Sequence, residues 1–252
     1  MNRPFKLFSL LLLVIIFAGC SKTGDDPTQT ASGCTLESLK EVFGGNTTAA
    51  FYFTYDNQGR VTRVDYGSKN SNQYETYTYS SDKILVTGTA LGNGTAVYDL
   101  DAGGRVIKYG NATFTYNSDG QLARMVDVNG PHSTTATYTY QNGNLVKLDQ
   151  VGQYGQPQPV NNIVLYEYDL TQSSNTAPGD PITFTATHRP GLGKYFGKGS
   201  ANLVKKEIIR MQNQPEESRV HTYTRDTKGN ITLVSTATAG GTGQKQLAYN
   251  CK

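Results

Sequence analysis

A short pattern that returns several times along the chain limits the folds that this sequence can adopt. Its first full copy runs from Phe53 to Val64 and reads FTYDNQGRVTRV, and a second runs from Phe114 to Met125 and reads FTYNSDGQLARM. Less regular copies begin at Tyr77, Tyr98, Tyr138 and Tyr223. Each copy places aromatic residues first, then a polar turn, then an alternation of aliphatic and polar residues. The chain is therefore expected to repeat one small structural unit.

Each copy has the pattern of a β-hairpin. Aromatic residues alternate with Thr at a period of two, which is typical of a strand with one buried face. The Asp or Asn that opens the turn accepts hydrogen bonds from backbone amides two residues further on. Gly59 and Gly120 close their turns, where a positive φ costs glycine little, and Asp82 takes this position in the copy at Tyr77. The sequence thus predicts an all-β fold built as an antiparallel meander of hairpins.

The first nineteen residues are interpreted as a signal peptide. Arg3 and Lys6 give a basic start, residues 7–17 are apolar, and Ala18-Gly19 precede Cys20. Small residues directly before a cysteine resemble the lipobox of bacterial lipoproteins. Cys20 is accordingly predicted to become the acylated N-terminus, so that its acyl chains attach the protein to a membrane.

Residues 20–33 are predicted to be a flexible tether, because they contain few apolar side chains. A single β domain is expected over residues 34–252. With Cys20 acylated, Cys34 and Cys251 are the two remaining cysteines, and we predict a disulfide bond between them. This bond would join the first strand to the last and favours a barrel-like sheet. An open β-spiral is the alternative.

The charge balance argues against nucleic acid as a partner. The chain has 23 Lys and Arg against 20 Asp and Glu, and loss of Arg3 and Lys6 leaves 21 against 20. A net charge of about +1 without a clustered basic face is not typical of a nucleic-acid-binding protein.

The turn signature YDNQGR at Tyr55 resembles the YD repeat of Rhs-type bacterial proteins, and related copies cover about residues 51–151 and 221–235. The segments KYFGKGSANLVKK and LAYNCK also look like parts of a family of small bacterial lipoproteins with YD-like repeats. The resemblance implies a lipid-anchored, all-β module outside the cytoplasm. The family resemblance transfers no catalytic residue.

The sequence contains no recognised catalytic or metal-binding motif. The three histidines, His132, His188 and His221, lie far apart, and the zinc-protease and serine-hydrolase signatures do not occur. We therefore expect no cofactor and no metal, and we interpret the protein as a module that binds a ligand or an envelope partner. Two alternatives are a hydrolase that acts on glycans or peptides through carboxylates brought together by folding, and a purely structural envelope component. The expected location is the outer membrane, at the cell surface or the periplasmic face.

An irregular insertion rich in Pro, Gly and Ser is expected near residues 169–202, where the repeat pattern stops. Its last part gathers basic and aromatic side chains at Arg189, Lys194, Tyr195, Phe196 and Lys198. These five residues form a candidate contact surface for an anionic or ring-bearing partner. Alternatively, the two rings close one end of the sheet.

Overall fold

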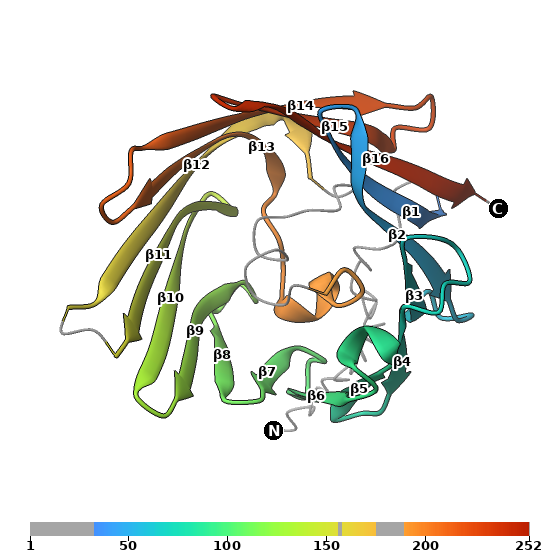
Figure 1. Cartoon of the computed structure of the whole chain (residues 1–252), viewed down its shortest axis with the longest axis horizontal. Coiled ribbons are helices and arrows are strands. Elements are labelled where there is room, and N and C mark those ends of the chain that lie inside the picture. Colours follow the sequence, from blue (N-terminus) through green and yellow to red (C-terminus); the bar gives the residue numbers. More distant parts are fainter. Residues whose placement is uncertain (1–32, 156–157, 175–188, 252) are drawn as a thin grey trace, which may run out of the picture.

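The computed structural model describes residues 33–155, 158–174 and 189–251, and these form a closed β-barrel (Figure 1). Each of the sixteen strands in these residues pairs antiparallel with the next, and β16 pairs with β1. The predicted meander and its closure are confirmed, and the open β-spiral is wrong. The strands are β1 (Cys34–Phe43), β2 (Asn46–Tyr55), β3 (Val61–Tyr66), β4 (Tyr74–Tyr79), β5 (Lys83–Thr87), β6 (Thr95–Leu100), β7 (Val106–Tyr109), β8 (Ala112–Tyr116), β9 (Leu122–Asn129), β10 (His132–Gln141), β11 (Asn144–Tyr154), β12 (Val160–Ser173), β13 (Asn202–Met211), β14 (Glu217–Arg225), β15 (Ile231–Thr238) and β16 (Gly241–Cys251).

The first and last strands close the barrel. Their ladder runs from the pair Cys34↔Cys251 to the pair Phe43↔Gly243. A disulfide bond of 2.00 Å joins Cys34 to Cys251, so the structure contains the bond that the cysteine count predicts. Closure of the sheet removes the two exposed strand edges that an open meander would leave.

The repeat turns lie together at one end of the barrel, which we call the repeat-turn end. At the first of them, Asp56 Oδ1 accepts hydrogen bonds from the backbone N–H groups of Gln58 and Arg60, both at 2.9 Å. Burial opposes ionisation of Asp56, but the hydrogen bonds from Arg60 and Gln58 outweigh it and lower the pKa of the carboxyl group. Gly59 and Gly120 have φ of 74° and 82°, as predicted.

One repeat turn differs from the expectation. Asp82 is absent from the described residues that have a positive φ, although the sequence alignment puts it in the glycine position. The chain reverses there over a shorter turn, in which the Ser80 N–H donates to the Lys83 carbonyl at 3.0 Å. Because the turn is shorter, no residue at position 82 needs the left-handed conformation.

Tyrosine hydroxyls donate hydrogen bonds between neighbouring copies of the repeat, beyond the point where the backbone ladder between them ends. The ladder between β3 and β4 extends no further toward the repeat turns than Arg63↔Thr76, which leaves Val61 beyond it. The Tyr79 hydroxyl donates a hydrogen bond of 2.6 Å to the Val61 carbonyl oxygen. The same bond, at 2.5 to 3.0 Å, joins Tyr55 to Leu36, Tyr116 to Val106, Tyr168 to Leu145, Tyr223 to Val204 and Tyr249 to Ile231. A side chain thus satisfies the carbonyl that the backbone ladder does not reach.

The turn arginine links one copy of the repeat to the next. Arg60 donates from Nε to Asp56 Oδ2 at 2.7 Å, and its guanidinium lies 4.6 Å from the centre of the Tyr79 ring. Asp101, Arg105 and Tyr116 repeat this arrangement. The Tyr, Asp and Arg of the motif therefore act together: Asp shapes the turn and holds Arg, and Arg covers the tyrosine of the following hairpin.

The core lies inside the barrel near the repeat-turn end, and part of the insertion fills it. The first aliphatic residue after each turn is almost completely buried, as at Val61, Val106, Leu145 and Ile231. Residues 189–201, which we call the plug, include the short 3-10 helix η2 (Gly193–Phe196) and lie inside the ring of strands (Figure 1). A second 3-10 helix, η1 (Thr89–Leu91), precedes β6. No helix of the described residues has the length and apolar character needed to cross a bilayer.

Tyr223→Phe tests the tyrosine hydrogen bonds. The substitution removes the 2.7 Å bond to Val204 while it keeps the ring, and we expect it to lower the free energy of unfolding by about 1 kcal/mol. Chemical denaturation would measure the change. The control is Tyr52→Phe, because Tyr52 lies on β2 with no hydroxyl hydrogen bond to the described residues. Equal stability of the two variants would contradict the proposed role of the hydroxyl.

Removal of the disulfide tests the closure of the barrel. The bond joins residues 217 positions apart, for which the chain-entropy model gives a stabilisation of about 5 kcal/mol as an upper figure. We expect the double variant Cys34→Ser and Cys251→Ser to melt at a lower temperature, and dithiothreitol to have the same effect on the unsubstituted chain. A melting temperature unchanged by both treatments would show that the strand ladder alone closes the barrel.

Candidate binding site on the inner wall of the barrel

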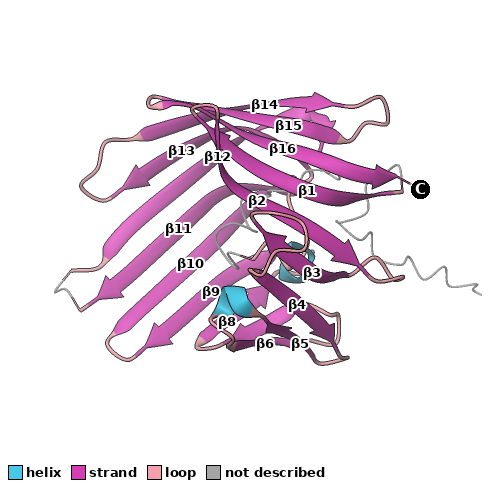
Figure 2. Ribbon diagram, turned by 45° about the vertical axis from the view of Figure 1, so that its right-hand side comes forward, coloured by secondary structure: helices cyan, strands magenta, loops and turns pink. Residues whose placement is uncertain are grey.

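The strands differ in length around the barrel, and this creates an inner wall on one side. Strands β3 to β8 have four to six residues, whereas β9 to β16 and β1 have eight to fourteen. The long strands extend toward the end opposite the repeat turns, which we call the distal end (Figure 2). Their distal halves therefore carry inward-facing residues that the short strands and the plug do not cover.

Many of these inward-facing residues are polar or charged. Tyr223 and Val234 pair across β14 and β15 and belong to the core. Because side chains alternate along a strand, His221 and Thr236, two residues nearer the distal end, face inward as well. The same step from other core residues reaches the rest of a set that we call the polar wall. Its members are Glu41, Glu207, Glu217, Arg219, His221, Thr236 and Lys245.

The members of the polar wall contact one another across neighbouring strands. His221 Nδ1 lies 3.0 Å from Thr236 Oγ1, and its Nε2 lies 3.5 Å from Glu207 Oε1. Arg219 donates from Nε to Glu217 Oε1 at 2.7 Å, and this hydrogen bond lowers the pKa of the Glu217 carboxyl group. Glu207 lies opposite Arg219 in the β13–β14 ladder. Arg219 therefore lies among two carboxylates and an imidazole.

Solvent reaches this inner wall. The side chains of Glu217, Arg219, Glu41 and Lys245 are 39%, 38%, 37% and 34% exposed, although all four point into the barrel. Side chains fill the interior of an eight-stranded barrel, but barrels of sixteen or more strands leave space for water. Here the plug occupies that space near the repeat-turn end, so among the described residues the distal lumen is the part that stays accessible.

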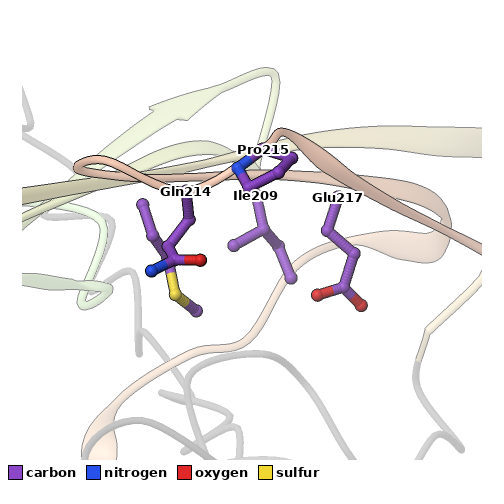
Figure 3. A pocket seen from close by; sticks show the side chains of 5 residues that line it. Ile209, Gln214, Pro215 and Glu217 are labelled. Carbon is purple, nitrogen blue, oxygen red and sulfur yellow. The ribbon is translucent and has the colours of Figure 1, made fainter.

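A pocket lies at the distal end of the β13–β14 hairpin (Figure 3). It has a volume of about 210 Å³ and is lined by Ile209, Met211, Gln214, Pro215 and Glu217. Ile209 and Glu217 are cross-strand partners, and Glu217 also belongs to the polar wall. The pocket is thus the distal continuation of the wall, with apolar sides and one carboxylate.

The five residues of the predicted contact surface separate into two groups. Arg189 forms an ion pair with Glu75 inside the barrel and donates from Nε to the Tyr98 hydroxyl at 2.7 Å. Phe196 is 1% exposed and meets Phe114 edge to face, with ring centres 5.1 Å apart. The Phe196 ring therefore has the alternative arrangement, in which the rings close one end of the sheet, whereas Arg189 is held by Glu75 and Tyr98 inside the barrel.

The other three residues lie nearer the surface of the plug. Tyr195 is half-buried and stacks on Tyr79 at 5.7 Å, with Lys194 Nζ 5.3 Å from the centre of the Tyr195 ring. Lys198 is exposed. A contact surface made by Lys194, Tyr195 and Lys198 stays a prediction.

Some predictions from the sequence fall outside the described residues. Cys20, the signal peptide and residues 20–32 of the tether are among these, so lipidation stays a prediction. Within the described ranges, no group of three or more His, Cys, Asp or Glu side chains is placed to hold a metal ion.

The polar wall was not predicted from the sequence, although the repeat contains a signal for it. In the segment ESRVHTYTR both faces of the strand are polar, so alternation alone does not show which side is buried. Tyr223, however, stands at the aromatic position of a repeat copy and must face the core. Counting back from it in steps of two reaches His221, Arg219 and Glu217.

Comparison with known proteins agrees with a barrel of repeated hairpins. The family model described as teneurin YD-shell matches residues 35–172, more than half of the chain. The chain therefore belongs to the teneurin YD-shell family, and its resemblance to YD-repeat proteins is confirmed. A search of the curated proteins finds no match.

Two solved structures share the fold. A porin-like protein from Bacteroides uniformis has a TM-score of 0.59 and 19% sequence identity, with 84% of this chain and 96% of the other covered. A porin-like protein from Bacteroides vulgatus has a TM-score of 0.61 and 13% identity, with 85% and 98% covered. At these identities the similarity shows the fold alone.

Gly197→Ala tests how tightly the plug is seated. Gly197 has a φ of 87°, and a Cβ atom there would lie 2.5 Å from the Gly120 carbonyl oxygen and 2.9 Å from the Tyr116 ring. We expect a loss of stability of about 2 kcal/mol or more, measured by chemical denaturation, because backbone strain and a steric clash add. Gly199→Ala is the control, since Gly199 is exposed and has no positive φ. Equal stability of both variants would contradict close packing of the plug.

Proposed function

We propose that the protein is an extracytoplasmic binding protein, attached to a membrane by acyl chains on Cys20, that takes a small polar ligand into its distal lumen. The observation that carries the proposal is the polar wall, where charged side chains face inward and remain in contact with water. Because these charged side chains are paired and solvated, they cost the fold little, and their polar groups stay accessible to a polar ligand that enters the lumen.

Ion pairs on the outer wall support the proposal that water surrounds the barrel. Lys147 and Asp149 flank the buried Leu148 on β11, so both face outward, and they form an ion pair at 2.8 Å. Glu167 on β12 and Lys206 on β13 form another outward pair at 3.8 Å. Transmembrane barrels instead carry an apolar outer band about 25 Å tall. We propose that this barrel stands beside the outer membrane, at the cell surface or the periplasmic face.

The position of the tether supports access from the distal end. Strand β1 starts at Cys34 at the repeat-turn end, which the plug fills. In the proposal, residues 21–33 connect this end to the acylated Cys20 and reach at most about 45 Å when fully extended. The plugged end would face the membrane, and the open distal end would face away from it.

A hydrolase acting on glycans or peptides is the second candidate. The observation in its favour is the row Glu207, His221 and Thr236, which places a carboxylate, an imidazole and a hydroxyl along one line of contacts. General acid–base catalysis uses such groups. The third candidate, a purely structural envelope component, has no specific observation in its favour.

Arg219→Ala tests ligand uptake. The purified chain would be titrated with a panel of short glycans and short peptides by isothermal calorimetry, with product analysis to detect hydrolysis. We expect binding that Arg219→Ala weakens at least about tenfold, as loss of a charge-assisted hydrogen bond would. Arg210→Ala is the matched control, because Arg210 forms a similar ion pair with Glu216 at 2.7 Å on the outer face of the same hairpin. Binding that both variants leave unchanged would contradict the proposed site.

Cys20→Ala tests the membrane anchor. We expect the variant to accumulate as unprocessed precursor or to leave the acylated-protein fraction in detergent partitioning, because the acyl chains attach through this cysteine. Cys34→Ala is the control for a general effect of cysteine loss. Equal partitioning of Cys20→Ala and the unsubstituted protein would remove the anchor from the proposal.

A further inference from the structure

The pocket at the distal end of the β13–β14 hairpin combines one carboxylate with apolar sides. Ile209, Met211 and Pro215 provide the apolar surface, and Glu217 and Gln214 provide the polar groups. Figure 3 shows Ile209, Gln214 and Glu217 projecting from the same side of the hairpin. The volume of about 210 Å³ is below the roughly 300 to 1,000 Å³ of pockets that enclose a whole drug-sized ligand. It fits one arm of a ligand.

The charge next to the pocket is negative. Arg219 donates to Glu217 Oε1 and lies opposite Glu207 in the ladder, so one guanidinium faces two carboxylates. These three groups sum to one negative charge. Glu217 Oε2 has no hydrogen-bond partner among the described residues, and the Glu217 side chain is 39% exposed. The pocket therefore offers a carboxylate oxygen to a donor that arrives from the lumen.

We propose that this pocket binds the alkylammonium arm of a ligand, such as a lysine side chain or another primary amine on a short carbon chain. The ammonium group donates to Glu217, and its methylene groups pack against Ile209, Met211 and Pro215. A carboxylate with nearby apolar surface matches both ends of such an arm. This inference rests on the proposed function, since it names the chemical class of the ligand that enters the distal lumen.

The neighbouring residue provides a matched control. Glu216 and Glu217 are adjacent in sequence, and each forms an ion pair of 2.7 Å with an arginine, Arg210 or Arg219. Glu217 lines the pocket and Glu216 does not. Glu216→Gln and Glu217→Gln therefore make the same chemical change at equally paired sites, one away from the pocket and one in it.

Methionine methyl NMR gives a local readout. The chain has three methionines: Met1 in the predicted signal peptide, Met125 packed against the core, and Met211 in the pocket. The chain labelled with ¹³C at the methionine methyl groups would be titrated with n-pentylamine, pentan-1-ol and pentanoate, which share one carbon chain. Met211 reports binding, and Met125 reports whether each variant keeps its fold.

We expect n-pentylamine to shift the Met211 signal saturably while the Met125 signal stays in place. The half-saturation concentration should rise about tenfold for pentan-1-ol, and pentanoate should give no shift, because the lost contact is a hydrogen bond between charged groups. Glu217→Gln should raise the half-saturation concentration of n-pentylamine about tenfold, and Glu216→Gln should leave it unchanged. Equal responses to the three probes, equal effects of the two variants, or an unmoved Met211 signal would each overturn the inference.

Failure of this inference and failure of the proposed function are distinguishable. If n-pentylamine does not shift the Met211 signal but a glycan or peptide still requires Arg219 for binding, the proposed ligand class is wrong and the proposed function is still supported. If n-pentylamine binds as described and no larger ligand requires Arg219, the alkylammonium site is supported and the proposed uptake of a ligand into the lumen is contradicted.

Discussion

The hydrogen bond from a tyrosine hydroxyl to a carbonyl on the preceding strand determines how this barrel holds together at its repeat-turn end. Carbonyls such as that of Val61 lie beyond the backbone ladder. Without the tyrosine hydroxyl they would be partly buried with no hydrogen-bond partner from that ladder. A net value of about 1 kcal/mol for each of the six bonds gives a sum comparable to the total stability of a typical domain, about 5 to 15 kcal/mol. Burial also raises the pKa of Tyr223 and Tyr249 above the ordinary value, so both hydroxyls stay protonated donors at neutral pH.

A sixteen-stranded barrel is too wide for its own side chains to fill, and the plug resolves this at one end only. Leu192 and Phe196 supply apolar volume that the strands lack, and both are almost completely buried. The buried ion pair between Arg189 and Glu75 adds little net stability by itself, because desolvation offsets much of the Coulomb attraction. Removing either partner would leave a buried charge, so the pair favours one position of the plug over others.

The fold was predictable from the sequence because each copy of the repeat contains the same strand pattern and the same turn residues. Gly59 and Gly120 require a positive φ, Asp56 caps its turn, and the pairing of Cys34 with Cys251 brings the two ends of the meander together. The short turn at Asp82 was wrongly aligned because a turn with two residues between its hydrogen-bonded ends and one with three both accept Asp. The local sequence pattern therefore did not determine the length of this turn.

The candidate site was harder to predict, for a physical reason. Glu207, His221 and Thr236 come from three strands and meet only through the registers of β13, β14 and β15, which no single segment encodes. The predicted cluster at residues 189–198 was local in sequence, and folding divided it: Phe196 turned into the core and Lys198 stayed outside. Proximity in sequence was a poor guide to the candidate site, whereas counting in steps of two from Tyr223 would have reached three of its residues.

Inward-facing side chains are mainly apolar at one end of the barrel and many are charged at the other, because the described residues fill only one end. An inward position near the repeat turns lies in the core, so an apolar side chain there gains burial, as Ile231 and Val234 do. An inward position at the distal end meets water, so Glu217 and Lys245 keep their charges at little cost. Because the plug comes from the chain itself, it fixes which part of the lumen is left for another molecule. In the proposed function, the choice of ligand would fall to residues such as Glu217, which the closure of the barrel does not require.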